Sequence, residues 1–129
     1  MSRIKGKNTR PEILVRKYLH SQGFRFRLHD KKLPGKPDIV LKKYKTAVFI
    51  NGCFWHGHSD CKYAVIPKTR TEWWKEKIER TAERDKENYS SLRSEGWKII
   101  IIWECDLKSD RIKETLHNIL KQLTDLRKP

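Results

Sequence analysis

The stretch DIVLKKYKTAVFI at residues 38–50 decides the fold, because it places two short apolar runs on either side of a basic segment. Residues 38–41 and 47–50 are rich in Val and Ile, and runs of this length bounded by polar residues are typical of strands. The connection through residues 42–45 is short. We therefore expect two neighbouring strands of one sheet.

Patterns typical of helices lie on both sides of this pair. The run Thr9-Arg10-Pro11-Glu12 reads as a capping box that opens a helix ending near Gly23. Residues 24–28 then alternate as a half-buried strand does. A second capping box, Thr69-Arg70-Thr71-Glu72, opens a long helix that ends near Glu95, before Gly96.

The last third of the chain completes the pattern. Residues 97–103 form a strand apolar enough to be buried on both faces, and apolar spacing over residues 112–123 marks a closing helix. The order is helix, three strands, a loop over residues 51–70, helix, strand and helix. This order predicts one α/β domain over residues 1–129, with a mixed sheet of about four strands flanked by helices.

The composition indicates a polyanionic partner. The 129 residues include 30 Lys and Arg against 16 Asp and Glu, which gives a formal net charge of +14. Nucleic acid is the commonest partner of so basic a domain, because neutralised phosphates release counterions. A membrane surface, an acidic protein or an ordinary solvated surface are the alternatives. The longest apolar run, residues 99–103, is too short to span a bilayer, and the N-terminus lacks the apolar part of a secretory signal, so we expect a soluble, cytoplasmic protein.

Three cysteines and one histidine suggest a metal site. Cys53, His58, Cys61 and Cys105 supply the ligand set of a closed, structural zinc site. An odd number of cysteines without a secretory signal argues against a disulfide framework. Cys105 as a buried core thiol is the alternative. Zinc is favoured because a 20-residue loop without periodicity needs something to organise it.

Three carboxylates are candidates for chemistry. Asp38 begins an apolar strand, where it could hold a divalent metal, although a surface turn explains it as well. Glu12 is explained by its place in the capping box. Asp85 falls within the apolar stripe of the long helix, and a carboxylate facing a core is costly unless paired. A histidine partner would serve general base catalysis, and an arginine or backbone partner would be structural.

Aromatic side chains lie among basic residues in and after the loop. Phe54 and Trp55 are adjacent within it, and Trp74 lies near the start of the long helix. Such side chains can stack on bases or wedge between them. For Trp74, a place in the core is the simpler alternative.

Several short motifs together resemble a known family, the very-short-patch-repair (Vsr) mismatch endonucleases. The similar motifs are PGKPD at residues 34–38, NGCFWHGH at 51–58, TRTEWW at 69–74, ERD at 83–85 and WEC at 103–105. The resemblance runs from Met1 to Cys105. It implies a bacterial enzyme with a restriction-endonuclease-like fold, which nicks one DNA strand beside the thymine of a T:G mismatch.

The resemblance also implies a role for each candidate residue. Asp38 matches the aspartate that holds catalytic Mg²⁺, His56 matches the general base, and Asp85 matches the carboxylate that orients it. Glu12 matches a further active-site acid. The structural zinc ligands correspond to Cys53, His58, Cys61 and Cys105, and the DNA-intercalating aromatics to Phe54, Trp55 and Trp74.

The chain departs from the family pattern at three points. Asn51 stands where some members have a second active-site histidine, one extra residue separates His58 from Cys61, and residues 1–8 would be only the end of a longer DNA-contacting arm. We expect a monomer with a functional link to a cytosine-5 DNA methyltransferase. Two alternatives remain: a zinc-stabilised DNA-binding module that does not cleave, and a restriction-type endonuclease that cuts matched DNA.

Overall fold

A computed structural model of the chain describes residues 10–54, 56–58 and 61–127, and its elements follow the expected order. The helices are α1 (Arg10–Ser21), α2 (Thr71–Ser94) and α3 (Ile112–Arg127). The strands are β1 (Arg27–Leu28), β2 (Ile39–Leu41), β3 (Thr46–Asn51) and β4 (Lys98–Trp103). Short 3-10 turns occupy Lys42–Tyr44, Lys62–Ala64 and Glu104–Leu107.

The four strands form one mixed sheet in the order β1-β2-β3-β4. β1 pairs antiparallel with β2, β2 antiparallel with β3, and β3 parallel with β4. Val48 lies opposite Ile39 on one side and Ile100 on the other. The predicted pair of neighbouring strands and the mixed α/β fold are therefore confirmed. This topology also brings the start of β2 and the ends of β3 and β4 to one edge of the sheet.

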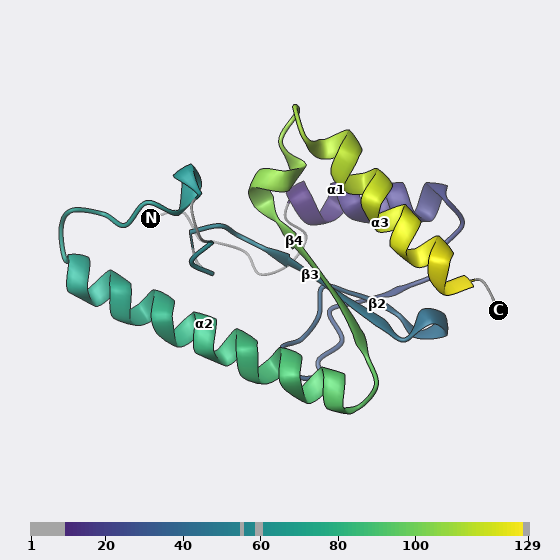
Figure 1. The fold of residues 1–129 in the computed structure, drawn as a ribbon, viewed down its shortest axis with the longest axis horizontal. Coiled ribbons are helices and arrows are strands. Elements are labelled where there is room, and N and C mark those ends of the chain that lie inside the picture. Colours follow the sequence, from purple (N-terminus) through teal and green to yellow (C-terminus); the bar gives the residue numbers. More distant parts are fainter. Residues whose placement is uncertain (1–9, 55, 59–60, 128–129) are drawn as a thin grey trace.

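Helices cover both faces of the sheet, α1 and α3 on one and α2 on the other (Figure 1). Alternate residues of β3 divide between two cores, as the period of a strand requires. Val48 packs into the larger core with residues of α1 and α3, whereas Ala47 and Phe49 pack with Leu92 of α2. One face of β4 is buried at Ile100 and Ile102, whereas Ile99, Ile101 and Trp103 on the other face are only partly buried, so the predicted burial of both faces is incomplete.

The strand predicted over residues 24–28 is shorter than expected. Only Arg27 and Leu28 pair with β2, opposite Val40 and Ile39. Phe24 is instead buried in the larger core.

The second predicted capping box is wrong. α2 begins at Thr71, and within the described part of the chain Arg70 precedes it in a left-handed conformation (φ 54°) without a side-chain capping bond. The Thr71 hydroxyl donates to the carbonyls of Pro67 and Lys68, so it closes the preceding turn. The first capping residue, Thr9, the arm at residues 1–8, and Trp55 lie outside the described residues.

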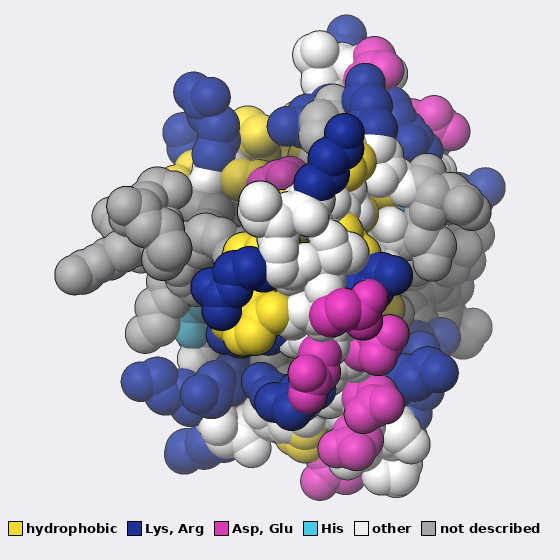
Figure 2. Space-filling model, turned by 90° about the vertical axis from the view of Figure 1, so that its left-hand side faces the viewer, with side chains coloured by type: hydrophobic (Ala, Val, Ile, Leu, Met, Phe, Trp, Pro, Cys, Tyr) yellow, Lys and Arg dark blue, Asp and Glu magenta, His cyan; other side chains and the backbone are white. Residues whose placement is uncertain are grey.

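Charge is unevenly distributed over the surface. On the side seen in Figure 2, Asp and Glu side chains gather in one run, with Lys and Arg side chains around it. On α2, exposed glutamates recur every three or four residues, at Glu72, Glu76, Glu79, Glu83 and Glu87. Among the described residues, no helix has both the length and the apolar character that a membrane span needs.

Candidate active site and metal centre

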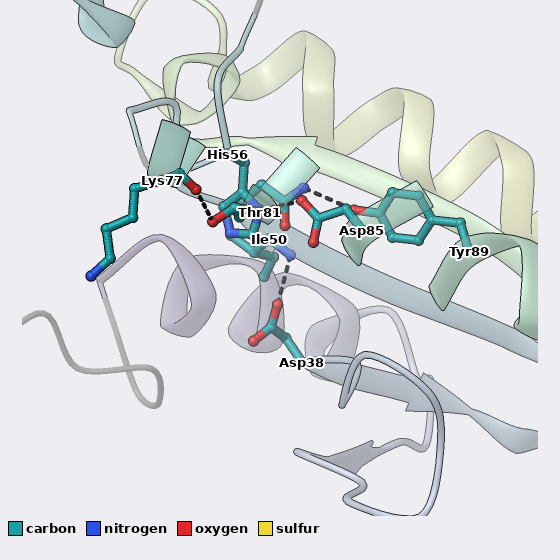
Figure 3. A network of polar contacts seen from close by, with 8 residues as sticks. Asp38, Ile50, His56, Lys77, Thr81, Asp85 and Tyr89 are labelled. Atoms are coloured by element: carbon teal, nitrogen blue, oxygen red, sulfur yellow. Dashed lines mark hydrogen bonds and ion pairs between the residues drawn. The ribbon is translucent and has the colours of Figure 1, made fainter. Parts of the chain in front are cut away.

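Asp38 lies where β2 begins, beside the end of β3. Its backbone N–H donates to the carbonyl of Val48 (3.0 Å), and its carboxylate accepts the backbone N–H of Ile50 (2.7 Å; Figure 3). Burial raises the pKa of the Asp38 carboxyl from 3.8 to about 6; the Ile50 hydrogen bond opposes this rise and the nearby Glu12 carboxylate adds to it. A carboxylate so placed is stabilised by added positive charge, so the position suits a divalent cation.

Glu12 reaches the same place from α1. Its side chain is 1% exposed and lies between Arg16 (Nη2 to Oε2, 2.7 Å) and His29 (Nε2 to Oε2, 2.9 Å). Three side chains, those of Glu12, His29 and Asp38, each offer one ligand atom. These atoms lie within 4.8 Å of one another, a spacing that could hold a metal ion. Carboxylate oxygens are the donors that Mg²⁺ prefers, so these residues fit a catalytic cation. Sequence reasoning missed Arg16, although it lies four residues after Glu12, and it missed His29.

His56 lies in the loop that follows β3 and meets Asp85 of α2. The distance between His56 Nδ1 and Asp85 Oδ2 is 2.6 Å (Figure 3). The loop is folded back by a hydrogen bond from the His56 N–H to the carbonyl of Gly52 (3.1 Å). The carboxylate in the apolar stripe of α2 therefore has a histidine as its partner. This contact is suited to general base chemistry, because it leaves Nε2 as the nitrogen that can take a proton.

A second polar contact supports the end of β3. Asn51 is 4% exposed, and its Nδ2 donates to the Tyr89 hydroxyl (3.0 Å), which lies one helical turn after Asp85. Burial raises the pKa of Tyr89, which keeps the phenol protonated near neutral pH. Asn51 thus binds α2 at the position where some family members have a histidine. From the sequence alone Tyr89 carries no signal of this contact, because a tyrosine at its spacing on the helix packs as readily as it hydrogen-bonds.

The four predicted zinc ligands lie together. One ligand atom each from Cys53, His58, Cys61 and Cys105 lie within 4.8 Å of one another. The Cys105 N–H donates to Cys53 Sγ (3.4 Å), and Cys105 Sγ lies 3.5 Å from His58 Nδ1. Burial raises the pKa of the Cys53 and Cys105 thiols. Three sulfurs and one imidazole converging in this way fit zinc, which binds them as thiolates and releases their protons.

Phe54, Trp73 and Trp74 form one group of aromatic side chains beside the site. Phe54 and Trp74 pack edge to face with 5.3 Å between ring centroids, and both are half-buried. Trp73, which sequence analysis did not single out, is 41% exposed. Arg70 and Lys77 place their cationic groups 4.6 and 4.9 Å from the centroid of its ring. A tryptophan outside the apolar stripe of α2 is a signal in the sequence that could have identified Trp73.

Comparison with known proteins agrees with this site. A family model described as DNA mismatch endonuclease Vsr matches residues 1–63. The type II nicking enzyme V.NmeAIP of Neisseria meningitidis serogroup A is 52% identical over 126 residues, which cover 97% of this chain and 89% of the relative. The DNA mismatch endonuclease Vsr of Escherichia coli is 43% identical over 84% of this chain and 69% of the relative.

The chain belongs to the Vsr family. A further Vsr-like relative, the type II nicking enzyme V.XorIIP of Xanthomonas oryzae pv. oryzae, is 46% identical over 93% of this chain and 88% of its own length. The resemblance read from the sequence motifs is thereby confirmed. As a Vsr family member the chain is a DNA endonuclease, and the alternative of a binding module that does not cleave is set aside.

Proposed function

We propose that this chain is a Mg²⁺-dependent endonuclease that nicks one DNA strand beside the thymine of a T:G mismatch, in very short patch repair. One observation carries the proposal: His56 is held 2.6 Å from Asp85, and the Glu12 and Asp38 carboxylates converge with His29 so that one ligand atom of each lies within 4.8 Å of the others. The names of the relatives, which include a mismatch endonuclease and nicking enzymes, support the same reaction.

The proposed reaction divides its roles between three carboxylates and one histidine. Asp38 and Glu12 would hold the cation at the sheet edge. Mg²⁺, when bound, offsets the negative charge that develops on the attacking and leaving oxygens. Asp85 accepts a hydrogen bond from the His56 Nδ1–H, so the lone pair of Nε2 faces the attacking water and takes its proton. The water oxygen bonds to phosphorus as the leaving oxygen departs, and the leaving oxygen takes up a proton from solvent, so one strand is cut.

The cysteine cluster and the aromatic residues would place this chemistry at the mismatch. Zinc bound to Cys53 and His58 on either side of His56 would fix the loop rather than take part in the reaction. Phe54 and Trp74, together with Trp55, would enter the base stack. A T:G pair is easier to unstack than a matched pair, so wedging aromatic side chains favour the mismatch.

The cellular setting belongs to the proposal as well. We expect the enzyme to act as a monomer in the bacterial cytoplasm. The deaminated product of a cytosine-5 DNA methyltransferase is a T:G pair, so we expect a functional link to such an enzyme.

The test uses end-labelled T:G and T:A duplexes of the same sequence, with and without Mg²⁺, resolved on a denaturing gel. The expected product is a single nick beside the mismatched thymine, only with Mg²⁺ and only in the T:G duplex. Cleavage of both duplexes would show a restriction-type nuclease instead. Failure to nick T:G duplexes in any sequence context would contradict the proposal.

A further inference from the structure

His29 is held in an unusual backbone conformation directly beside Asp38. It follows β1 with a positive φ of 50°, and its backbone N–H donates to the carbonyl of Asp38 (3.2 Å). A left-handed conformation is unfavourable in a residue other than glycine, so the surrounding contacts must stabilise it. The backbone therefore fixes the direction of the His29 side chain relative to Asp38.

The spacing of three side chains fits the first shell of an octahedral cation. His29 Nε2 lies 2.9 Å from Glu12 Oε2, and the ligand atoms of Glu12, His29 and Asp38 all lie within 4.8 Å of one another. Around an ion with bonds of about 2.1 Å, adjacent ligand atoms are ~3 Å apart and opposite ones ~4.2 Å. The three atoms are thus close to coordination distance before a metal binds.

The charges at the site favour a cation at the same point. Glu12 and Asp38 bring two negative charges into a largely buried space, and Arg16 pairs with one of them. A neutral imidazole adds a donor without adding charge, so a divalent ion would reduce the repulsion between the two carboxylates. The His29 side chain is 16% exposed, which leaves it partly shielded from water that would compete for the ion.

We propose that His29 is a third protein ligand of the catalytic cation, through Nε2, and that the site consequently prefers Mn²⁺ to Mg²⁺. The inference rests on the proposed function in one respect, that Glu12 and Asp38 hold the cation. On binding, the metal takes the place of the hydrogen between Nε2 and Glu12, and the ring stays neutral because its hydrogen is then carried on Nδ1. Imidazole nitrogen is a better ligand for Mn²⁺ than for Mg²⁺, which favours oxygen alone.

The test measures metal binding rather than cleavage. Zinc-loaded protein without DNA is titrated with Mn²⁺, and free Mn²⁺ is followed by its electron paramagnetic resonance signal. Bound Mn²⁺ is then examined by electron spin echo envelope modulation, which detects a directly bonded ¹⁴N. The variant is His29→Gln, whose amide can still hydrogen-bond to Glu12. Controls are His20→Gln, an exposed histidine on α1, and His56→Ala, which removes the other nearby imidazole.

We expect ¹⁴N coupling in the wild type and in both controls, and its loss in His29→Gln. Loss of the ligand should weaken Mn²⁺ binding about tenfold or more, and Mg²⁺ binding less. Bound Mn²⁺ without ¹⁴N coupling in the wild type would overturn the proposal even if His29→Gln failed to fold. Mn²⁺ binding that is abolished by Asp38→Asn but lacks nitrogen coupling would leave the proposed function standing. Mn²⁺ binding that Asp38→Asn does not change would contradict both.

Discussion

The hydrogen bond between His56 and Asp85 determines which imidazole nitrogen carries the proton. In Asp85→Asn the amide can donate to Nδ1, which would place the proton on Nε2, the wrong nitrogen for a base. We expect single-turnover nicking of a T:G duplex to slow about 10²- to 10⁴-fold, with zinc content and DNA affinity unchanged. Glu83→Gln, an exposed change two residues away, should leave the rate unaltered. Equal rates in the two variants would contradict the base assignment.

The buried Asp38 carboxylate should lower the free energy of unfolding of the metal-free protein. Its pKa is about 6 in the folded chain and 3.8 in the unfolded chain, so the folded state binds more protons between these values. The free energy of unfolding therefore falls as pH rises from about 4 to above 6, by up to about 3 kcal/mol from this group. Asn can still accept the Ile50 N–H. We expect metal-free Asp38→Asn to melt higher than the wild type at pH 7.5, with the gap closing by pH 4, in thermal melts without Mg²⁺. A lower melting temperature at pH 7.5 would contradict the burial cost.

Single residues differ in how much the sequence reveals of their partners. Asp85 was predictable as a paired carboxylate, because helical periodicity places it in an apolar stripe. Its partner was not, because His56 and His58 occupy a loop without periodicity, and only the family resemblance separated them. His29 carried no signal at all. Its role depends on a left-handed backbone and on α1 meeting β1, and both are properties of the folded chain.

The loop that follows β3 packs closely against α2 at Gly57. Gly57 has φ +61°, and a Cβ there would lie 2.7 Å from Ile78 Cγ2. Gly57→Ala should therefore destabilise the fold by more than the roughly 1–2 kcal/mol that the left-handed backbone alone costs an alanine. It should also lower the melting temperature and the nicking rate. Gly23→Ala is the matched control, since it has a similar φ and its Cβ would meet none of the described atoms within 4 Å.

The contact between Gly57 and Ile78 can also be tested with a second, compensating substitution. Ile78→Ala in the Gly57→Ala background removes the colliding methyl group, so part of the nicking rate should return. If Gly57→Ala behaves like Gly23→Ala in melts and in nicking assays, the contact with Ile78 does not position His56.

Elements were predictable in type, but their lengths depend on pairing. The apolar runs at residues 38–41 and 47–50 predicted β2 and β3, because strand pairing and burial both favour Val and Ile there. β1 is shorter than its alternating sequence suggests, since Phe24 is buried in the larger core and its N–H binds the carbonyl of Leu19 at the end of α1. Likewise, Thr71 closes the turn before α2, so the capping pattern around Thr69 does not mark the start of the helix.

At the scale of the whole molecule, the net charge of +14 explains attraction to DNA but not which face meets it. The proposed site lies at the sheet edge where β3 and β4 end, beside α2, so we expect DNA to cover that edge. Lys77 lies there, over the ring of Trp73. α3 instead runs back to contact the Lys42–Tyr44 turn at the opposite edge, and carries the exposed Lys121.

These two lysines give a matched test of the DNA-binding face. Lys77→Gln should weaken binding of a T:G duplex and reduce the slope of log K against log salt concentration by about one, because one phosphate contact is lost. Lys121→Gln removes the same charge from a helix surface and should leave both unchanged. Fluorescence anisotropy titrations at several salt concentrations measure both quantities. Equal effects of the two changes would mean that only the net charge matters, and a flat salt response in the wild type would contradict phosphate contacts altogether.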